Sequence, residues 1–258
     1  MNIVVCVKQV PDTAVERTLT PQGTLDRASL DGLINELDEY AIEEGLKIAE
    51  AHGGEVTILS MGPAKAADSI RKALSMGADK AVHVTDDGLA GSDALATSAA
   101  LAAALKAVGF DLVVFGSEST DARTGVVPAM VAERLGVAQL TLASKVDISG
   151  SEVTIRRVTD DGYAVVSGPL PAVVSVVEKI NEPRYPTFKG IMAAKKKPVQ
   201  VLALTDLSVD AGSVGLAHAA TRVDDFAARP PRQAGVIVKD DGDGGAKAAG
   251  FLAERKFI

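Results

Sequence analysis

The feature that most constrains the fold is an alternation of short apolar runs with longer segments of helical periodicity. The runs are rich in β-branched residues, apolar on both faces and bounded by Gly, Pro or Asp, as in buried parallel strands. They cover residues 2–8, 55–61, 80–84 and 111–116. Between them, apolar residues recur at helical spacing, and Ser92 is the expected N-cap of the third helix.

Alternation at this spacing predicts right-handed βαβ crossovers, and hence an α/β fold with a doubly wound, mainly parallel sheet and helices on both faces. In such sheets ligands bind beyond the carboxyl ends of the strands, where the strand order reverses. The loops to search for a site are therefore "VKQVPD", "SMGPA" and "FGSESTDARTG", because each of them leaves such an end.

The pattern changes after Gly136, where alternating residues and three turn signals predict a small β-hairpin appendage. A last core strand is expected near 172–177. Beyond Pro198 the packing signals weaken and Pro, Gly and charged residues gather. We therefore predict a nucleotide-binding α/β domain over 1–198 and a C-terminal arm over 199–258 that needs another surface to lie on.

Charge and composition argue against several classes of function. The chain has 27 Lys and Arg residues against 34 Asp and Glu residues, so its overall field disfavours nucleic acid. The one cysteine and three histidines lack ligand spacing, so we expect no metal site and no disulfide framework. The N-terminus does not resemble a signal peptide, and no apolar run is long enough to cross a bilayer, so we expect a cytoplasmic protein without membrane insertion.

Two loops favour a phosphate-bearing ligand. Gly62 lies in "SMGPA" between a predicted strand and a predicted helix, where it allows a ligand to approach the backbone closely. The loop 116–125 gathers hydroxyl residues before another helix, whose N-terminal amides can accept phosphate. No histidine lies near these loops, and Cys6 sits inside a strand, so no nucleophile and base are expected to catalyse a reaction.

The segment 181–197 places apolar residues directly before three lysines. Lys195–Lys197 would complement the carboxyl end of a helix that begins near Gly190. That does not explain Tyr185 and Phe188 in a proline-stiffened loop, because exposed aromatic side chains there usually mark a binding surface.

Six segments, taken in order, resemble the beta subunit of electron transfer flavoprotein, most closely the actinobacterial type. They are "VKQVPD", "NELDEYAIEEGLKIAE", "SMGPA", "IRKALSMGADKAVHV", "ESTD…TGVVPAMVAERLG" and "NEPRYPTFKGIMAAKKK". The resemblance implies the adenine-nucleotide-binding fold shared with universal-stress proteins and ATP pyrophosphatases. It also implies an electron carrier, not an enzyme in its own right.

The resemblance further implies a heterodimer with an alpha subunit that holds most of the FAD, while this chain buries a structural AMP. Electrons would come from acyl-CoA or other flavin dehydrogenases, as in fatty acid oxidation, and would pass to a quinone oxidoreductase. The segment 181–197 would be the recognition loop that docks dehydrogenases, and residues 199–258 would pack on the alpha subunit.

Site residues follow from the same resemblance. Those implied for the AMP pocket are Cys6, through its backbone, Asn35, Glu36, Leu37, Asp38, Met61, Gly62, Gly116, Ser117, Glu118, Ser119, Thr120, Asp121 and Thr124. By position alone, Thr13 is expected to approach the flavin. Those implied for partner binding are Tyr185, Phe188, Ile191 and Met192.

Two alternatives stay open. Members of the family that split electron pairs hold a second FAD in place of AMP, and the loop residues do not separate the two cases. A stand-alone nucleotide-binding module of the universal-stress type would share the fold, although it does not account for the recognition loop or the long arm. An ATP pyrophosphatase would need a different loop after the first strand than "VKQVPDT".

Overall fold

The computed structural model describes residues 1–227, 230–232 and 235–258. A nine-stranded sheet forms its centre, in the order β11-β5-β4-β1-β6-β10-β7-β8-β9. The strands are β1 (Asn2–Cys6), β4 (Glu55–Met61), β5 (Lys80–Val84), β6 (Leu112–Gly116), β7 (Ala138–Ser149), β8 (Glu152–Thr159), β9 (Gly162–Pro169), β10 (Ala172–Val176) and β11 (Val199–Leu202). A small second sheet pairs β2 (Gln9–Pro11) with β3 (Gly32–Ile34).

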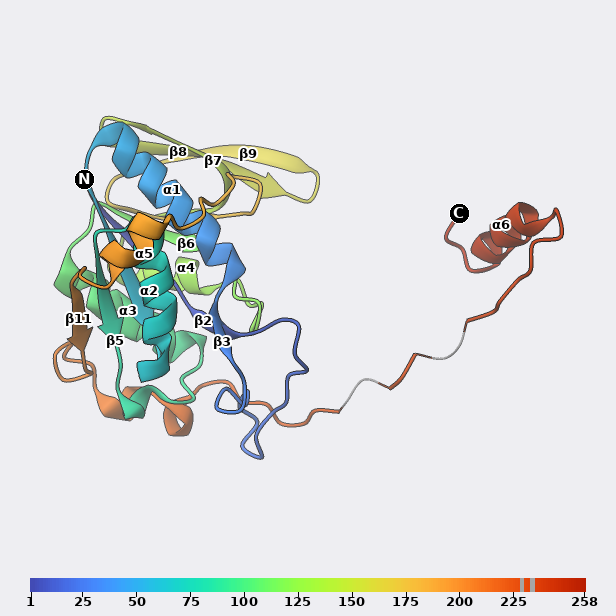
Figure 1. Ribbon diagram of the computed structural model, residues 1–258, viewed down its shortest axis with the longest axis horizontal. Helices are drawn as coiled ribbons and strands as arrows, with labels where there is room; N and C mark the ends of the chain where they lie inside the picture. The colour runs from blue at the N-terminus through green and yellow to red at the C-terminus, as the bar shows by residue number, and fades with distance from the viewer. Residues whose placement is uncertain (228–229, 233–234) are drawn as a thin grey trace. The chain divides into compact units, whose positions relative to one another are not determined.

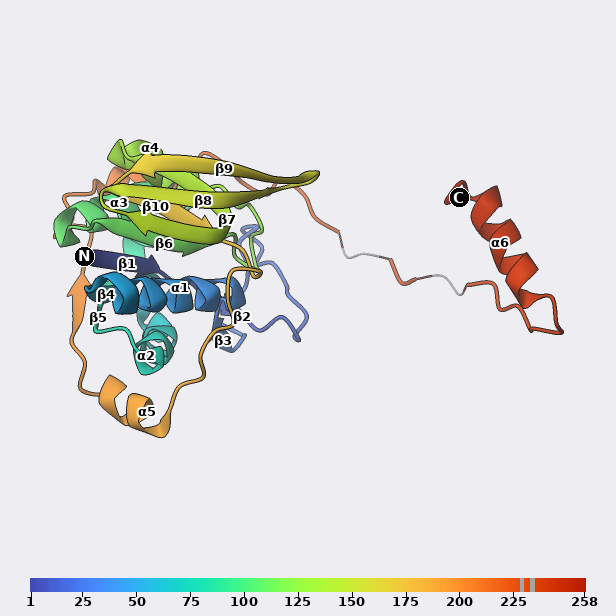
Figure 2. The same cartoon turned by 90° about the horizontal axis from the view of Figure 1, so that it is seen from above.

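The helices are α1 (Glu36–His52), α2 (Ala67–Met76), α3 (Ala94–Val108), α4 (Val127–Leu135), α5 (Phe188–Ala194) and α6 (Gly244–Glu254). Of these, α1 and α2 cover one face of the sheet, and α3 and α4 cover the other (Figures 1 and 2). Successive side chains of β1 serve the two faces in turn. Ile3 and Val5 join the core cluster beneath α1 and α2, whereas Val4 and Cys6 join the cluster beneath α3 and α4.

The strand order reverses at β1. Its neighbours are β4 on one side and β6 on the other, both parallel to it, with Ile3 opposite Val56 and Leu112. The chain first moves outward through β4 and β5 and then returns across β1 to β6. The predicted doubly wound α/β fold is therefore confirmed, and its switch point lies at the carboxyl ends of β1, β4 and β6.

The predicted hairpin strands are present as β7, β8 and β9, which pair antiparallel with one another. They extend the main sheet, because β7 also pairs in parallel with β10 over Ala138–Ala143. The register shifts between Val174 and Val176, where Leu142 has a φ of 61° and donates its N–H to the Ser175 hydroxyl. This bulge lets the long strand bend away from the sheet.

The first compact unit is longer than the domain predicted from the sequence. It runs over Met1–Val223, and a second unit covers Asp224–Ile258. β11 adds an edge strand beside β5, and Leu204 and Val214 are buried against the α3 side. The boundary expected after Pro198 thus lies inside the first unit, because "VQVL" is too short to show a periodicity of its own.

The second unit contains α6, and no residue of this helix is buried. Four residues of the predicted arm, 228–229 and 233–234, lie outside the described residues. In the parts of the chain that the structure describes, no helix has the length and apolar character needed to traverse a bilayer.

The predicted N-cap of α3 is wrong by one residue. Asp93 is the cap, and its carboxylate accepts the N–H of Ala96 at 3.0 Å. The Ser92 hydroxyl instead accepts the N–H of Gly215 at 2.8 Å, in the segment that returns after β11. Asp93 also accepts the N–H groups of Ala220 and Thr221, so both residues contact the segment that returns after β11.

Candidate functional site

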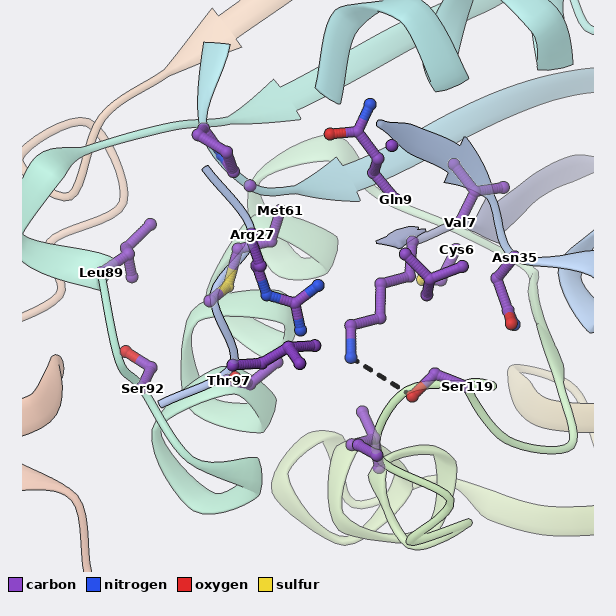
Figure 3. Close-up of a pocket in the computed structure, with 18 of the residues that line it drawn as sticks. Cys6, Val7, Gln9, Arg27, Asn35, Met61, Leu89, Ser92, Thr97 and Ser119 are labelled. Atoms are coloured by element: carbon purple, nitrogen blue, oxygen red, sulfur yellow. Dashed lines mark hydrogen bonds between the residues drawn. The ribbon is translucent and has the colours of Figure 1, made fainter. Parts of the chain in front are cut away.

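A cavity of about 780 Å³ lies beyond the carboxyl ends of β1, β4, β5 and β6 (Figure 3). This volume falls within the range of about 300–1,000 Å³ that is typical of ligand sites. Apolar side chains form much of its wall, and most of them come from the strands and from the α3 side of the sheet. They include Val7, Leu59, Met61, Leu89, Leu101, Phe115 and Val127. Such a wall suits a flat, largely apolar ring.

One side of the cavity is cationic. Lys8 follows β1, and its Nζ donates to the Ser119 hydroxyl in the loop after β6 at 3.2 Å; Figure 3 marks this hydrogen bond to Ser119 with a dashed line. Arg27 reaches the same region from the segment between β2 and β3. Burial lowers the pKa of Lys8, and the neighbouring Asp121 opposes this effect. Both cations line the cavity, so an anionic group of a ligand would meet them there.

Asp121, which does not line the cavity, pairs with both of these cations. Its side chain is 0% exposed and pairs with Lys8 Nζ at 2.8 Å and with the Arg27 guanidinium. Burial alone would raise the pKa of Asp121, but Lys8 and Arg27 outweigh it and hold this pKa well below its usual range. A permanent carboxylate therefore joins three segments that are distant in sequence.

Asn35, the residue before α1, fixes the loop after β6. Its Nδ2 donates to the Glu118 carbonyl at 2.9 Å, and its Oδ1 accepts the Thr120 N–H at 3.0 Å. Gly116 leaves the last strand position free for α1, because a Cβ there would lie 2.5 Å from Asp38 Oδ1. The buried amide and the glycine thus bring the α1 N-terminus and the loop together.

Asp38 is buried at the cavity, in the first turn of α1. Burial raises its pKa to about 7, although its Oδ2 accepts the Lys8 backbone N–H at 2.8 Å. Burial also raises the pKa of the nearby Cys6 thiol well above its usual value. A thiol in that state is a weak nucleophile, which fits the expected role of Cys6 as a core residue.

The beginning of α4 completes the site. Its N-cap residue, Val126, provides no side-chain cap, and Val127 and Pro128 line the cavity. Gly125 precedes them with a φ of 63°, a backbone conformation that favours glycine. The uncapped N–H groups of this helix are therefore available to an anion at the edge of the cavity.

Ten of the fifteen residues predicted for cofactor binding line this cavity. They are Cys6, Asn35, Asp38, Met61, Gly62, Gly116, Ser117, Glu118, Ser119 and Thr124. The other five do not line it, namely Thr13, Glu36, Leu37, Thr120 and Asp121. Of these, Thr120 and Asp121 act on the wall through Asn35 and Lys8, while Thr13 and Glu36 are exposed.

Several lining residues were not predicted from the sequence. Lys8 is the last residue of the predicted strand 2–8 and stands in the quoted loop "VKQVPD", so its position was a usable signal. Arg27 lies in a segment without periodicity, and only the tertiary structure brings it to Asp121. The same holds for the wall formed by residues 85–94, which precedes α3.

The predicted recognition segment 181–197 exposes its apolar side chains. Tyr185 is 92% exposed and Phe188 is 81% exposed, and Ile191 and Met192 are also exposed on α5. Thr187 caps α5 by accepting the Gly190 N–H at 3.0 Å. Exposed apolar side chains that gather on one short segment are typical of binding surfaces.

The lysines of this segment have different roles. Lys197 Nζ donates to the carbonyls of Leu74, Gly77 and Ala78, so it caps the carboxyl end of α2 instead of α5, the helix that was expected. The reason is that the chain turns after α5 and runs past the end of α2 towards β11. Lys195 and Lys196 remain exposed.

Among the described residues, no group of three or more His, Cys, Asp or Glu side chains could hold a metal ion. The buried His83 shares a hydrogen bond of 3.0 Å with the carbonyl of Gly62, a residue that lines the cavity.

Comparison with known proteins gives a consistent result. A family model described as "Electron transfer flavoprotein domain" matches residues 22–207. The electron transfer flavoprotein subunit beta of Mycobacterium leprae is 50% identical over 264 residues, which cover 100% of this chain and 99% of that protein. The corresponding subunit of Mycobacterium tuberculosis is 51% identical with the same coverage. That of Clostridium acetobutylicum is 38% identical over 259 residues, with 100% of both chains covered.

Proposed function

The chain belongs to the electron transfer flavoprotein family as a beta subunit, and from this premise we propose that it holds a structural AMP within a heterodimeric electron carrier. The observation that carries the proposal is the cavity at the switch point, which joins apolar walls to a cationic side. A nucleotide has this same division between an apolar base and an anionic phosphate.

The cavity residues fit AMP in chemical character. The phosphate would lie among Lys8, Ser119 and the uncapped start of α4, because these supply cationic, hydroxyl and amide donors. The base would lie against apolar residues such as Met61 and Phe115. Asn35 and Asp121 would keep the loop after β6 in place. Asp121 would do so without contacting the ligand.

The redox-active FAD would be held mainly by an alpha subunit and only enclosed by this chain. FAD supplies the electron-accepting ring when it is bound. Thr13 is exposed and does not line the AMP cavity, so it is free to face a second subunit. The chain itself would then position cofactors and partners and would have no independent catalytic activity.

Donors and acceptors would meet the carrier at its surface. We assign docking of acyl-CoA or other flavin dehydrogenases to the exposed apolar side chains Tyr185, Phe188, Ile191 and Met192. A quinone oxidoreductase would receive the electrons, and the cytoplasm remains the expected location. The second unit, Asp224–Ile258, would pack on the alpha subunit, because its helix α6 buries none of its own residues.

The test is to co-express this chain with an alpha-type subunit, purify the complex and quantify the nucleotides released on denaturation. One FAD and one AMP per heterodimer is the expected result. Two FAD molecules would instead assign the chain to the electron-bifurcating class. A stable monomer that forms no complex would contradict the proposal and favour a stand-alone nucleotide-binding module.

A further inference from the structure

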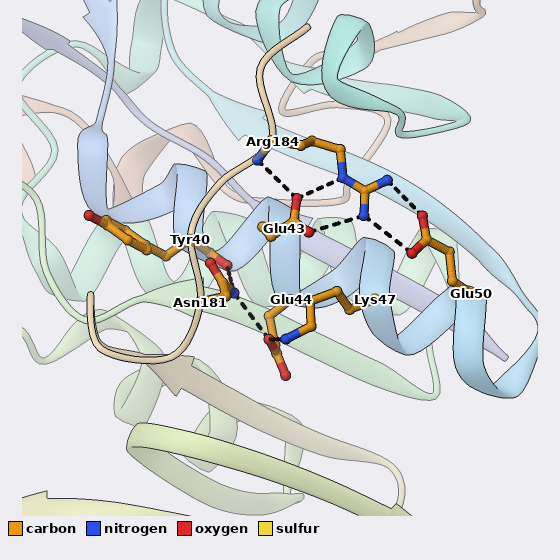
Figure 4. Close-up of polar contacts among 7 residues, drawn as sticks. All are labelled: Tyr40, Glu43, Glu44, Lys47, Glu50, Asn181 and Arg184. Carbon is orange, nitrogen blue, oxygen red and sulfur yellow. Dashed lines mark hydrogen bonds and ion pairs between the residues drawn. The ribbon is translucent and has the colours of Figure 1, made fainter.

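Arg184 ties the start of the segment 181–197 to the outer side of α1 (Figure 4). Its guanidinium donates to Glu43 through Nε at 2.7 Å and through Nη2 at 3.0 Å. It also donates to Glu50 through Nη1 at 2.6 Å and through Nη2 at 3.2 Å. The Arg184 backbone N–H donates to Glu43 as well, at 3.1 Å. One residue thus makes five hydrogen bonds to two carboxylates of one helix.

The geometry of this contact requires arginine. A planar guanidinium can present two parallel N–H pairs to two carboxylates at once, whereas a lysine ammonium is a point charge. The Glu43 side chain is only 9% exposed, so its buried negative charge depends on Arg184 for a compensating positive charge. The Glu50 side chain is 60% exposed, so its pair with Arg184 contributes less.

A second polar contact to α1 holds the segment at Asn181, before Arg184 in the chain. Asn181 Nδ2 donates to the Tyr40 carbonyl at 3.1 Å and to Glu44 Oε2 at 3.0 Å (Figure 4). Lys47 neutralises the same Glu44 from the following turn of α1. The segment therefore leaves the sheet along α1 under polar restraint at both Asn181 and Arg184.

The far end of the segment is fixed on α2. Gly190 approaches so closely that a Cβ there would lie 2.5 Å from the Ser75 carbonyl oxygen. Arg71 of α2 donates to the Ala194 carbonyl at 2.7 Å, and Lys197 caps α2 in return. The two helices thus satisfy each other's terminal carbonyls.

Between these two ends, Tyr185 and Phe188 project into solvent and have little packing of their own. Their placement must therefore come from the backbone on either side, and Arg184 is the immediate neighbour of Tyr185. A docking surface that is already ordered avoids the entropy cost of ordering it on binding.

We propose that Arg184 is a positioning residue: by pairing with Glu43 and Glu50, it holds the segment 181–197, here called the docking segment, in its binding-competent shape. This inference rests on the proposed function, because it assigns the segment to dehydrogenase docking. Arg184 acts through the segment's backbone and through α1, and it touches neither the nucleotide cavity nor its lining residues.

The test uses the purified heterodimer with an acyl-CoA dehydrogenase as electron donor. We expect Arg184→Ala to raise the apparent KM for the carrier about tenfold, since the surface must then be ordered during binding. We expect kcat, flavin content and reduction by dithionite to stay as in the wild type.

Comparison variants test the geometry of the contact. Arg184→Lys should restore little of the wild-type KM, and Glu50→Gln should raise KM less than Arg184→Ala. Lys80→Ala removes an exposed ion pair elsewhere and serves as the matched control.

A double variant separates positioning from general loss of stability. If Arg184 acts through the apolar surface, Arg184→Ala should add little to the KM of Phe188→Ala, because residues that act as a unit are not additive. Amide hydrogen exchange should rise at 182–192 in Arg184→Ala but not in β6. Two outcomes would overturn the positioning role and leave the proposed function standing. One is that the effects of Arg184→Ala and Phe188→Ala on KM are additive. The other is that Phe188→Ala raises KM while Arg184→Ala leaves it unchanged. A wild-type complex that the dehydrogenase does not reduce would overturn the proposed function as well.

Discussion

At the cavity and at the docking segment, one charged side chain pairs with two side chains of opposite charge, but the signs are reversed. At the cavity one buried carboxylate, Asp121, lies between two cations from different parts of the chain. At the docking segment one cation, Arg184, lies between two carboxylates of a single helix. The first arrangement draws three segments inward around a hollow. The second ties one segment to the outside of α1 and leaves its aromatic side chains exposed.

This difference predicts different sensitivities. The cavity cluster has a fully covered centre, so its loss should affect folding, nucleotide content and assembly. The ion pairs of Arg184 with Glu43 and Glu50 are partly exposed, and both carboxylates belong to α1, a helix that is already packed against the sheet. Loss of these ion pairs should affect the shape of the docking surface and leave the core intact. The four predictions that follow test this contrast.

The largest expected effect is a pH dependence of stability that arises from Asp38 at the cavity. Asp38 has a pKa of about 7 in the folded protein, against about 3.9 in an unfolded chain. Because the folded pKa is the higher one, the neutral carboxyl stabilises the fold below pH 4 or so, and this contribution is lost as the pH rises to about 7. Relative to Asp38→Asn, the wild type should lose on the order of 4 kcal/mol of unfolding free energy across this window.

Chemical denaturation of both proteins between pH 4 and pH 8 or so would measure this loss. Only the difference in slope matters, because the asparagine also changes a hydrogen bond to the Lys8 N–H at every pH. Parallel curves for the wild type and Asp38→Asn would show that this carboxyl is not neutral in the fold.

A second large effect is expected for Asp121→Ala. The change leaves Lys8 and Arg27 without their shared carboxylate, and we expect a loss of about 3 kcal/mol or less, since both cations are partly exposed. The yield of assembled complex and its AMP content should fall, whereas the flavin potential should not move. Asp147→Ala, which breaks an exposed pair with Lys145, is the matched control. A large shift in potential with normal assembly would contradict the structural role of this pocket.

A smaller effect on stability is expected from the far end of the docking segment. Lys197→Met removes the cap from the last carbonyls of α2, which should cost about 1–2 kcal/mol. Lys196→Met changes an exposed side chain of the same type and should cost almost nothing. Thermal unfolding of the two variants measures the contrast, and equal melting temperatures would rule out this cap.

The smallest expected change in stability comes from the docking surface itself. Phe188→Ala removes an exposed side chain, so the fold and the flavin content should not change. Coupling to a dehydrogenase should weaken by about tenfold if Phe188 fills a partner pocket. Leu216→Ala alters another exposed apolar side chain and is the control. Equal electron-transfer rates in wild type and Phe188→Ala would remove Phe188 from the docking surface.

Much of the fold could be predicted from the sequence, because its signals are local. The strands β4 and β5 have the bounds that their apolar runs indicate, and the loops after β1, β4 and β6 do meet at one cavity. Predictions failed where a residue has two possible partners. Ser92 and Asp93 are both good caps, and the folded structure uses Asp93 for the helix while Ser92 accepts the Gly215 N–H.

From the residue pattern alone, the candidate site was predictable where it follows a recognised strand, whereas Asn35 and Asp38 were expected from the family resemblance. Gly62 and Ser119 stand in such loops, and both line the cavity. Arg27 lies in an irregular segment, so nothing near it in sequence indicates that it reaches Asp121. Edge strand β11 was missed for a similar reason, since four residues show no period and only pairing with β5 makes them a strand.

The sequence by itself determined the layers, the strand ends that carry the site and the apolar residues of the docking segment, because periodicity and turn chemistry act over a few residues. The tertiary structure alone decided which charges meet. Lys8 and Arg27 could each have found many carboxylates, as could Arg184, and Lys197 could have capped its own helix. Long side chains choose partners by proximity in the folded state, and proximity between distant segments is fixed only when the sheet and its helices have packed.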